Sequence, residues 1–168
     1  LRESYDKLVI AVGAAPVVPP IPGAHLEGVF TLREVNDAVA IRAYAQAEKA
    51  KSAVIIGGGM VGLETAENLK KAGLEVTVAE MQNQILPGLL DSDMAEQTAA
   101  ALRKSGIRVL TGAGVKEILG DSKAEGVIAA SMKIPAQVVV MAVGVRPATD
   151  FLEGSGISME QGAILVND

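Results

Sequence analysis

Three glycines, Gly57, Gly59 and Gly62, form the pattern G-x-G-x-x-G, in which backbone N–H groups can surround a phosphate. An apolar, β-branched run at residues 52–56 precedes the pattern, and a stretch with helical periodicity follows it. The next apolar run leads to an acidic residue, Glu80. A strand, a glycine turn, a helix and an acid in this order predict a dinucleotide site, because each can bind a different part of the ligand.

Each glycine has its own physical role in such a site. Gly57 allows a sharp turn out of the strand, Gly59 leaves room for a pyrophosphate against the backbone, and Gly62 lets the helix pack close to the strand. The N–H groups of residues 59–62 would face the diphosphate at the positive end of the helix. Glu80 would accept two hydrogen bonds from the hydroxyls of the adenosine ribose. The alternative is a tight strand-to-helix turn that binds no ligand.

Glu80 also bears on the choice of dinucleotide. A carboxylate repels a 2′-phosphate, and residues 81–90 contain no Lys or Arg that could neutralise one. We therefore expect NAD(H) rather than NADP(H). The pattern alone does not distinguish NAD from FAD, because both contain an ADP group. It is also compatible with a nucleotide-binding or redox-sensing module that catalyses nothing.

Composition argues against several other kinds of site. The 168 residues, about one domain, contain no Cys and one His, His25, so the chain has no thiol nucleophile and no multi-histidine metal site. The formal net charge of −5 and the 2% aromatic content argue against partners such as nucleic acid or an anionic membrane. No apolar run approaches the roughly 20 residues of a membrane helix. We predict no catalytic residue and no metal site.

The hydrophobic pattern predicts an α/β fold, with a Rossmann-like parallel sheet, flanking helices and a small antiparallel β excursion. We interpret the Pro-rich segment 16–23 either as a connector between units or as a surface loop. The expected strands are residues 7–12, 52–56, 74–79, 107–110, 115–119, 126–130, 136–143 and 162–166, and the expected helices are residues 33–49, 60–71 and 91–105.

The helix at residues 33–49 is expected to begin with a capping box. Thr31 and Glu34 stand three residues apart, so that each side chain can accept a hydrogen bond from the backbone N–H of the other. Helical spacing then predicts that Val35, Ala38 and Val39 lie on the inner face of the helix.

Three segments resemble, in order, motifs of the FAD-dependent pyridine nucleotide-disulfide oxidoreductases. Residues 5–16 (YDKLVIAVGAAP) resemble the segment that closes the first part of the flavin domain. Residues 54–67 (VIIGGGMVGLETAE) resemble the NAD(P)H fingerprint, and residues 138–149 (VVVMAVGVRPAT) resemble the later A-x-G-x-R-P-N-T motif. The chain is most similar to the branch of NADH oxidases, NADH peroxidases and coenzyme A-disulfide reductases.

The resemblance implies roles for residues that the spacing alone does not assign. Met60 and Val61 would lie beside the nicotinamide and pyrophosphate, and Gly144 would meet the nicotinamide end. Glu64 would lie near the nicotinamide at the flavin, whereas the residues alone favour a solvated surface glutamate. The cofactor-binding residues expected in full are Gly13, Arg33, Gly57, Gly59, Met60, Val61, Gly62, Glu64, Glu80 and Gly144.

Two of these residues, Gly13 and Arg33, would face the flavin by the same resemblance.

Two positions depart from the family pattern. Met60 stands where the branch commonly has a Tyr that shields the flavin, which puts such gating in doubt, and Ala148 stands where Asn is usual. The amino-terminal FAD fingerprint and the redox cysteine of the family are not found in the chain.

The resemblance further implies that the chain is part of a longer protein. Residues 1–30 would be the edge of the flavin domain and a connector, residues 31–147 the NAD(H)-binding domain, and residues 148–168 a return segment. The whole protein would be a cytoplasmic homodimer with flavin and dimerisation domains. It would pass hydride from NADH to FAD and on to a disulfide, peroxide, oxygen or protein acceptor. We expect this chain alone to be inactive.

Overall fold

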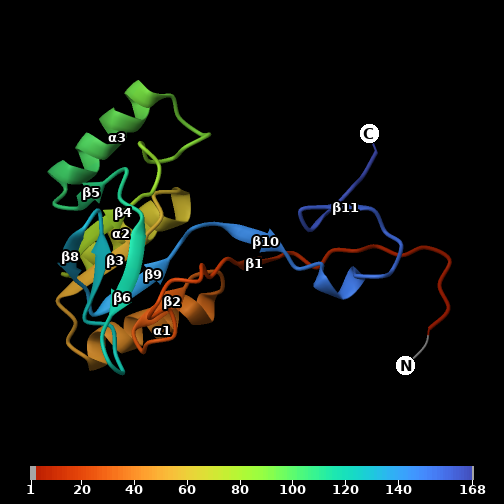
Figure 1. The fold of residues 1–168 in the computed structure, drawn as a ribbon, viewed down its shortest axis with the longest axis horizontal. Helices are drawn as coiled ribbons and strands as arrows, with labels where there is room; N and C mark the ends of the chain where they lie inside the picture. The colour runs from red at the N-terminus through yellow and green to blue at the C-terminus, as the bar shows by residue number, and fades with distance from the viewer. Residues whose placement is uncertain (1–2, 168) are drawn as a thin grey trace. The chain divides into compact units, whose positions relative to one another are not determined.

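The computed structural model describes residues 3–167, which group into two units (Figure 1). The larger unit is Pro16–Gly144, and the smaller one combines residues 3–15 with residues 145–167. We expected the connector to extend to residue 30, but the segment 16–30 groups with the larger unit. Leu26 explains this, because its side chain is buried in a hydrophobic cluster with Ile118 and Val127.

A five-stranded parallel sheet forms the centre of the larger unit and confirms the expected Rossmann-like fold. The strand order is β2-β9-β3-β4-β5, with every neighbouring pair parallel. In strands β3, β4 and β9, every residue after the first is buried, and most are apolar, as expected for strands that are covered on both faces. The bounds of the five strands are β2 Val29–Thr31, β3 Ser52–Ile56, β4 Glu75–Ala79, β5 Arg108–Leu110 and β9 Val138–Met141.

Helices cover one face of this sheet, and an antiparallel sheet covers the other (Figure 1). The helices α1 Val35–Ala47, α2 Met60–Lys71 and α3 Ser92–Lys104 share a core with alternate residues of the central strands. The strands β6 Val115–Leu119, β7 Gly126–Ala129 and β8 Met132–Pro135 pack on the remaining alternate residues. The expected excursion is therefore present, with β8 as an additional strand.

All three helices end in the same backbone arrangement, a Schellman motif. In α2 and α3 the left-handed residue after the cap is a glycine, Gly73 at φ +96° and Gly106 at φ +84°. In α1 the equivalent residue is Lys49, at φ +51°. A side chain in this region of backbone space costs roughly 1–2 kcal/mol, so α1 carries a strain that the other two helices avoid.

The smaller unit holds two short strand pairs and one turn of 3₁₀-helix. Strand β1, Ala14–Pro16, pairs with β10, Val145–Pro147; β11, Met159–Glu160, pairs with β12, Ala163–Ile164; and the 3₁₀ turn is Asp150–Leu152. The expected strand at residues 7–12 is wrong. Its backbone is irregular, and Leu8 and Val9 are exposed. A strand buried on both faces needs hydrogen-bonded neighbours, and the described residues supply none for this segment.

The start and the inner face of α1 also differ from expectation. The N-cap is Glu34, and the backbone N–H groups of Arg33 and Glu34 donate to Asp37 Oδ2 at 2.8 and 2.9 Å. Thr31 is the last residue of β2 instead of the cap. The side chain that α1 buries in the core is Ile41.

The neighbours of Ile41 mark the same inner face. Tyr44 and Ala45 pack against the core. Of the three residues that we expected inside, Ala38 is half-buried, whereas Val35 and Val39 are 81% and 59% exposed.

Replacing Asp37 by Ala is expected to lower the free energy of unfolding by about 1 kcal/mol, since a cap acceptor is lost. Hydrogen bonds from the backbone of Glu34 and of Arg33 lower the pKa of Asp37 from its ordinary 3.8. The carboxylate therefore stabilises the fold above pH 3.8, and this contribution is lost as the pH falls through the lowered pKa. Urea unfolding at neutral and strongly acidic pH measures both effects.

A matched control is Asp121→Ala, in an exposed turn, which should change stability little. If Asp37→Ala left neutral-pH stability at the wild-type value, Asp37 would contribute nothing to the start of α1.

Candidate dinucleotide site

Most of the expected site residues lie at one edge of the parallel sheet. Gly57 follows β3, Glu80 follows β4, and Gly144 follows β9 by three residues. Because the strands are parallel, their carboxyl ends share this edge. The chain passes from β3 to β4 on one side, and β9 lies on the other side of β3. Such a reversal of strand order is where open α/β sheets bind ligands.

Gly57 is required by the backbone at this reversal. Its φ is +109°, and a Cβ there would overlap the carbonyl oxygen of Ala142. Its N–H donates to the carbonyl of Ala79 at 2.9 Å, and the N–H of Ala142 donates to the carbonyl of Ile56 at 2.8 Å. These bonds hold the ends of three strands together around a turn that only glycine can make.

The backbone at Gly59, by contrast, does not require a glycine. Its φ of −78° suits any residue, and a Cβ at this position would meet no atom within 4 Å. It is the N-cap of α2 without any side-chain cap, and the first intrahelical bond runs from the N–H of Leu63 to its carbonyl. The N–H groups of residues 59–62 thus precede the first helical bond. Open space beside uncapped donors fits an anionic ligand at the positive helix end.

Gly62 serves packing. A Cβ there would overlap the carbonyl oxygen of Gly57 and lie 3.3 Å from Ile55 Cγ2. The absence of a side chain therefore lets α2 pack directly onto β3, as the sequence predicts.

Glu80 is buried, at 7% exposure, and both of its carboxylate oxygens accept backbone hydrogen bonds. Oε2 accepts from the N–H of Gly58 at 2.6 Å, and Oε1 accepts from the N–H of Gln82 at 2.7 Å. We expected Glu80 to accept two hydrogen bonds from the ribose hydroxyls, and the sequence did not indicate these backbone donors. Since each carboxylate oxygen has two acceptor positions, both can still accept a hydroxyl. Glu80 thus shapes the glycine turn on which it would bind a ligand.

The remaining predicted residues take varied positions. Met60 and Val61, in the first turn of α2, are 66% and 52% exposed. Glu64 is exposed one turn further along α2. Gly144 has a φ of +109° with open space around its Cβ position, which favours glycine for backbone reasons alone.

Two predicted flavin-facing residues lie elsewhere in the fold. Arg33 is exposed beside the start of α1. Gly13 belongs to the smaller unit, with a φ of +68°.

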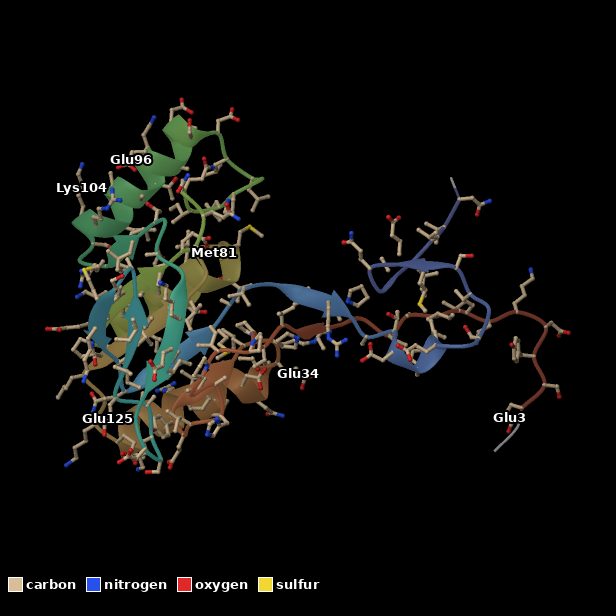
Figure 2. The ribbon with its side chains drawn as sticks, viewed as in Figure 1. Glu3, Glu34, Met81, Glu96, Lys104 and Glu125 are labelled. Carbon is tan, nitrogen blue, oxygen red and sulfur yellow. The ribbon has the colours of Figure 1, made fainter. Side chains whose placement is uncertain are left out.

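Sequence reasoning missed a second loop at this edge. After β5, the N–H of Gly112 donates to the carbonyl of Gln82 at 2.7 Å, and that of Ala113 donates to the carbonyl of Glu80 at 2.8 Å. Met81, 71% exposed and labelled in Figure 2, packs at 3.4 Å from where a Cβ of Gly114 would lie. The G-x-G spacing of Gly112 and Gly114 was the available signal, but no second feature supported it.

Other kinds of site are not found in the part of the chain that the structure describes. Residues 3–167 contain no cluster of three His, Cys, Asp or Glu side chains that could hold a metal ion. Within the same residues, no helix is both long and apolar enough to cross a membrane.

Comparison with known proteins identifies the family. The model of the pyridine nucleotide-disulphide oxidoreductases matches residues 2–168. The chain belongs to this family. It is 41% identical to an NADH oxidase of Methanocaldococcus jannaschii over 98% of its length, and it spans 37% of that relative.

Solved structures of other proteins also resemble the chain closely. An NAD-dependent persulfide reductase from A. fulgidus is 41% identical with a TM-score of 0.92, over 98% of this chain and 31% of that one. A water-forming NADH oxidase from Lactobacillus brevis, bound to NADH, is 28% identical with a TM-score of 0.85, over 95% of this chain and 35% of that one. The chain thus spans about a third of the length of these relatives.

Replacing Glu80 by Gln should test its double role. Gln offers one oxygen and one NH₂ group, so the backbone N–H of Gly58 or of Gln82 must lose its acceptor. The expected cost is about 1–3 kcal/mol in the free energy of unfolding, measured by urea denaturation.

Glu75→Gln, at the exposed start of the same strand, is the control and should cost little. Equal stability of the two variants would show that the bonds from Glu80 to the glycine turn contribute nothing.

Proposed function

We propose that the larger unit is the NAD(H)-binding domain of a flavin-dependent oxidoreductase. In the whole protein, hydride would pass from NADH to FAD and on to a disulfide, peroxide, oxygen or protein acceptor. The observation that carries this proposal is the open space beside Gly59 at the uncapped start of α2, next to a glycine, Gly58, that is bonded to the carboxylate of Glu80. Family membership supports the redox chemistry, and the NADH-bound relative supports the choice of dinucleotide.

Different residues would bind different parts of NAD(H). The N–H groups of residues 59–62 would hold the diphosphate, and Glu80 would accept the ribose hydroxyls while repelling a 2′-phosphate. Met60 and Val61 would offer an apolar surface to the nicotinamide, and the glycine backbone at Gly144 would approach its amide end. The cofactors supply the hydride chemistry, and the chain supplies alignment and exclusion of water.

The remaining parts of the proposal rest on the resemblance to the family. Residues 3–15 and 145–167, the smaller unit, would belong with a flavin domain, and Gly13 and Arg33 would face FAD. Glu64 would lie near the nicotinamide. The whole protein would be a homodimer acting in the cytoplasm.

The variant Gly59→Ala separates ligand binding from folding. The backbone of Gly59 suits Ala, and the added methyl group meets no protein atom, so the urea midpoint should not change. NADH should bind more weakly by about 1–3 kcal/mol, because the methyl group enters the path of the diphosphate. Isothermal titration calorimetry measures the affinity.

The control for this variant is Ser122→Thr, which adds a methyl group to the exposed turn between β6 and β7. It should bind NADH as the wild type does. Unchanged affinity in Gly59→Ala would place the phosphates elsewhere and refute the site.

The purified chain should be colourless and should not oxidise NADH in the presence of any acceptor unless a flavoprotein is added. The physical reason is that this chain is proposed to bind NAD(H) but not the flavin that would accept the hydride. Visible absorbance and NADH consumption at 340 nm, the usual wavelength for reduced nicotinamide, test both points. Flavin bands would instead assign the glycine turn to the ADP group of FAD.

A further inference from the structure

A groove of about 860 Å³ lies between α1 and α2, on the helix-covered face of the larger unit. Its volume falls within the roughly 300–1,000 Å³ of small-molecule sites. Val61 and Glu64 line one end, but Gly57, Gly59 and Glu80 do not line it. The groove is therefore a second concave surface beside the proposed dinucleotide site, and nothing proposed so far occupies it.

The walls of the groove are mostly small and apolar. Ala38, Ile41 and Ala45 contribute from α1 at helical spacing and form one apolar stripe. On the opposite wall, Leu69 and the C-cap residue Ala72 are apolar, whereas Thr65 and Asn68 add polar groups nearer the start of α2. A long apolar group could lie along the α1 stripe and contact Leu69 and Ala72.

Charge is distributed unequally along the groove. Both helices connect parallel strands and therefore run in the same direction, so the residues that end α1 and α2 share one end of the groove. Lys49 and Lys51 line that end, with Arg42 two turns back along α1, whereas the acidic Glu64 lies toward the opposite end. Within residues 3–167, none of the three cations forms an ion pair.

The hydrogen bonds that close α1 are made by backbone groups and not by lysine side chains. The carbonyls of Ala45 and Gln46 accept hydrogen bonds from the N–H groups of Ala50 and Lys49, at 2.9 and 3.2 Å. Lys49 adopts φ +51° where the other two helices have glycine. The chain therefore has a cation at the mouth of the groove at a position where glycine would relieve backbone strain.

The geometry points to a binding site for an amphipathic anion, with an unbranched apolar body between the helices and a carboxylate beside Lys49 and Lys51. Glu64 sets the orientation, because it repels a carboxylate at the other end of the groove. Arg42 contributes further positive charge along the α1 wall. The groove shares Val61 and Glu64 with the proposed NAD(H) site, but the glycine turn and Glu80 do not line it, so loss of NAD(H) binding at the turn would leave the groove intact.

Sodium decanoate, below its micelle-forming concentration, is the probe, and decan-1-ol is its uncharged counterpart. Titration into the ¹⁵N-labelled chain, followed by amide chemical shifts, should show saturable binding of decanoate. The shifts should concentrate in residues 38–51 and 61–74. Decanol should bind at least several-fold more weakly. An absence of saturable decanoate binding, or equal binding of both probes, would overturn the proposal.

Lys49→Gly gives a readout that a structural lysine would not give. Relief of the left-handed strain should raise the melting temperature, while the affinity for decanoate falls several-fold. Adding Lys51→Gln should bring the loss to about tenfold, equivalent to about 1.4 kcal/mol. Lys104→Gln, at the exposed end of α3, is the charge control and should change neither. A fall in melting temperature with unchanged affinity would show that Lys49 only supports the helix end.

Filling the groove is the steric test. Ala45→Phe projects a ring between the helices and should abolish decanoate binding. Val39→Phe, on the exposed side of α1, is the matched control and should not. Both variants should bind NADH as the wild type does, so a failure here is distinguishable from a failure of the proposed function. Full decanoate affinity in Ala45→Phe would overturn the assignment of the groove.

Discussion

The buried carboxylate of Glu80, which accepts hydrogen bonds from two backbone N–H groups, organises the candidate site. Glu80 is bonded to Gly58 in the glycine turn and to Gln82 in the loop that follows β4. The turn itself has no side chains that could hold its shape, since residues 57–59 are all glycine. The charge-assisted hydrogen bond from the N–H of Gly58 to the carboxylate of Glu80, directly after the neighbouring strand β4, supplies that support. Glu80, which would bind the sugar, is therefore hydrogen-bonded to the glycine turn that would bind the phosphates, so a change in one should affect the other.

This coupling has a consequence for dinucleotide choice. Removing the charge of Glu80 to admit a 2′-phosphate also removes an acceptor from the glycine turn. A preference for NADPH in this scaffold should therefore require a second change that restores support to Gly58. The proposed preference for NAD(H) thus follows from packing as well as from charge repulsion.

Sequence patterns predicted those elements in which local and tertiary signals agree. The bounds of β3 and α2 agree with the structure because a continuous apolar run, a glycine turn and helical spacing each mark the same boundary. The inner face of α1 was predicted only in part. Ala38 is half-buried, but Val35 and Val39 are exposed, because Ile41 and Tyr44 are the side chains that pack against the core. The cap lies three residues later than expected, at Glu34.

Other features could not be read from residue types. The strand expected at residues 7–12 depends on neighbours that local pattern cannot supply. Strand β8, with the sequence MKIP, has no alternation of polar and apolar residues strong enough to predict a strand. The hydrogen bonds of Glu80 come from backbone N–H groups, which every non-proline residue carries, so residue types do not reveal them. The difference between Gly59, which faces open space, and Gly62, which faces the Gly57 carbonyl, likewise appears only in three dimensions.

The central claim is that main-chain nitrogens of the glycine turn hold the diphosphate of NADH while Glu80 holds the adjacent sugar. An amide chemical-shift titration of the ¹⁵N-labelled chain with NADH tests it most directly. The account predicts that the largest shifts fall on the N–H groups of residues 58–62 and of Gln82. Saturable binding of NADH that leaves these amides unshifted would contradict it.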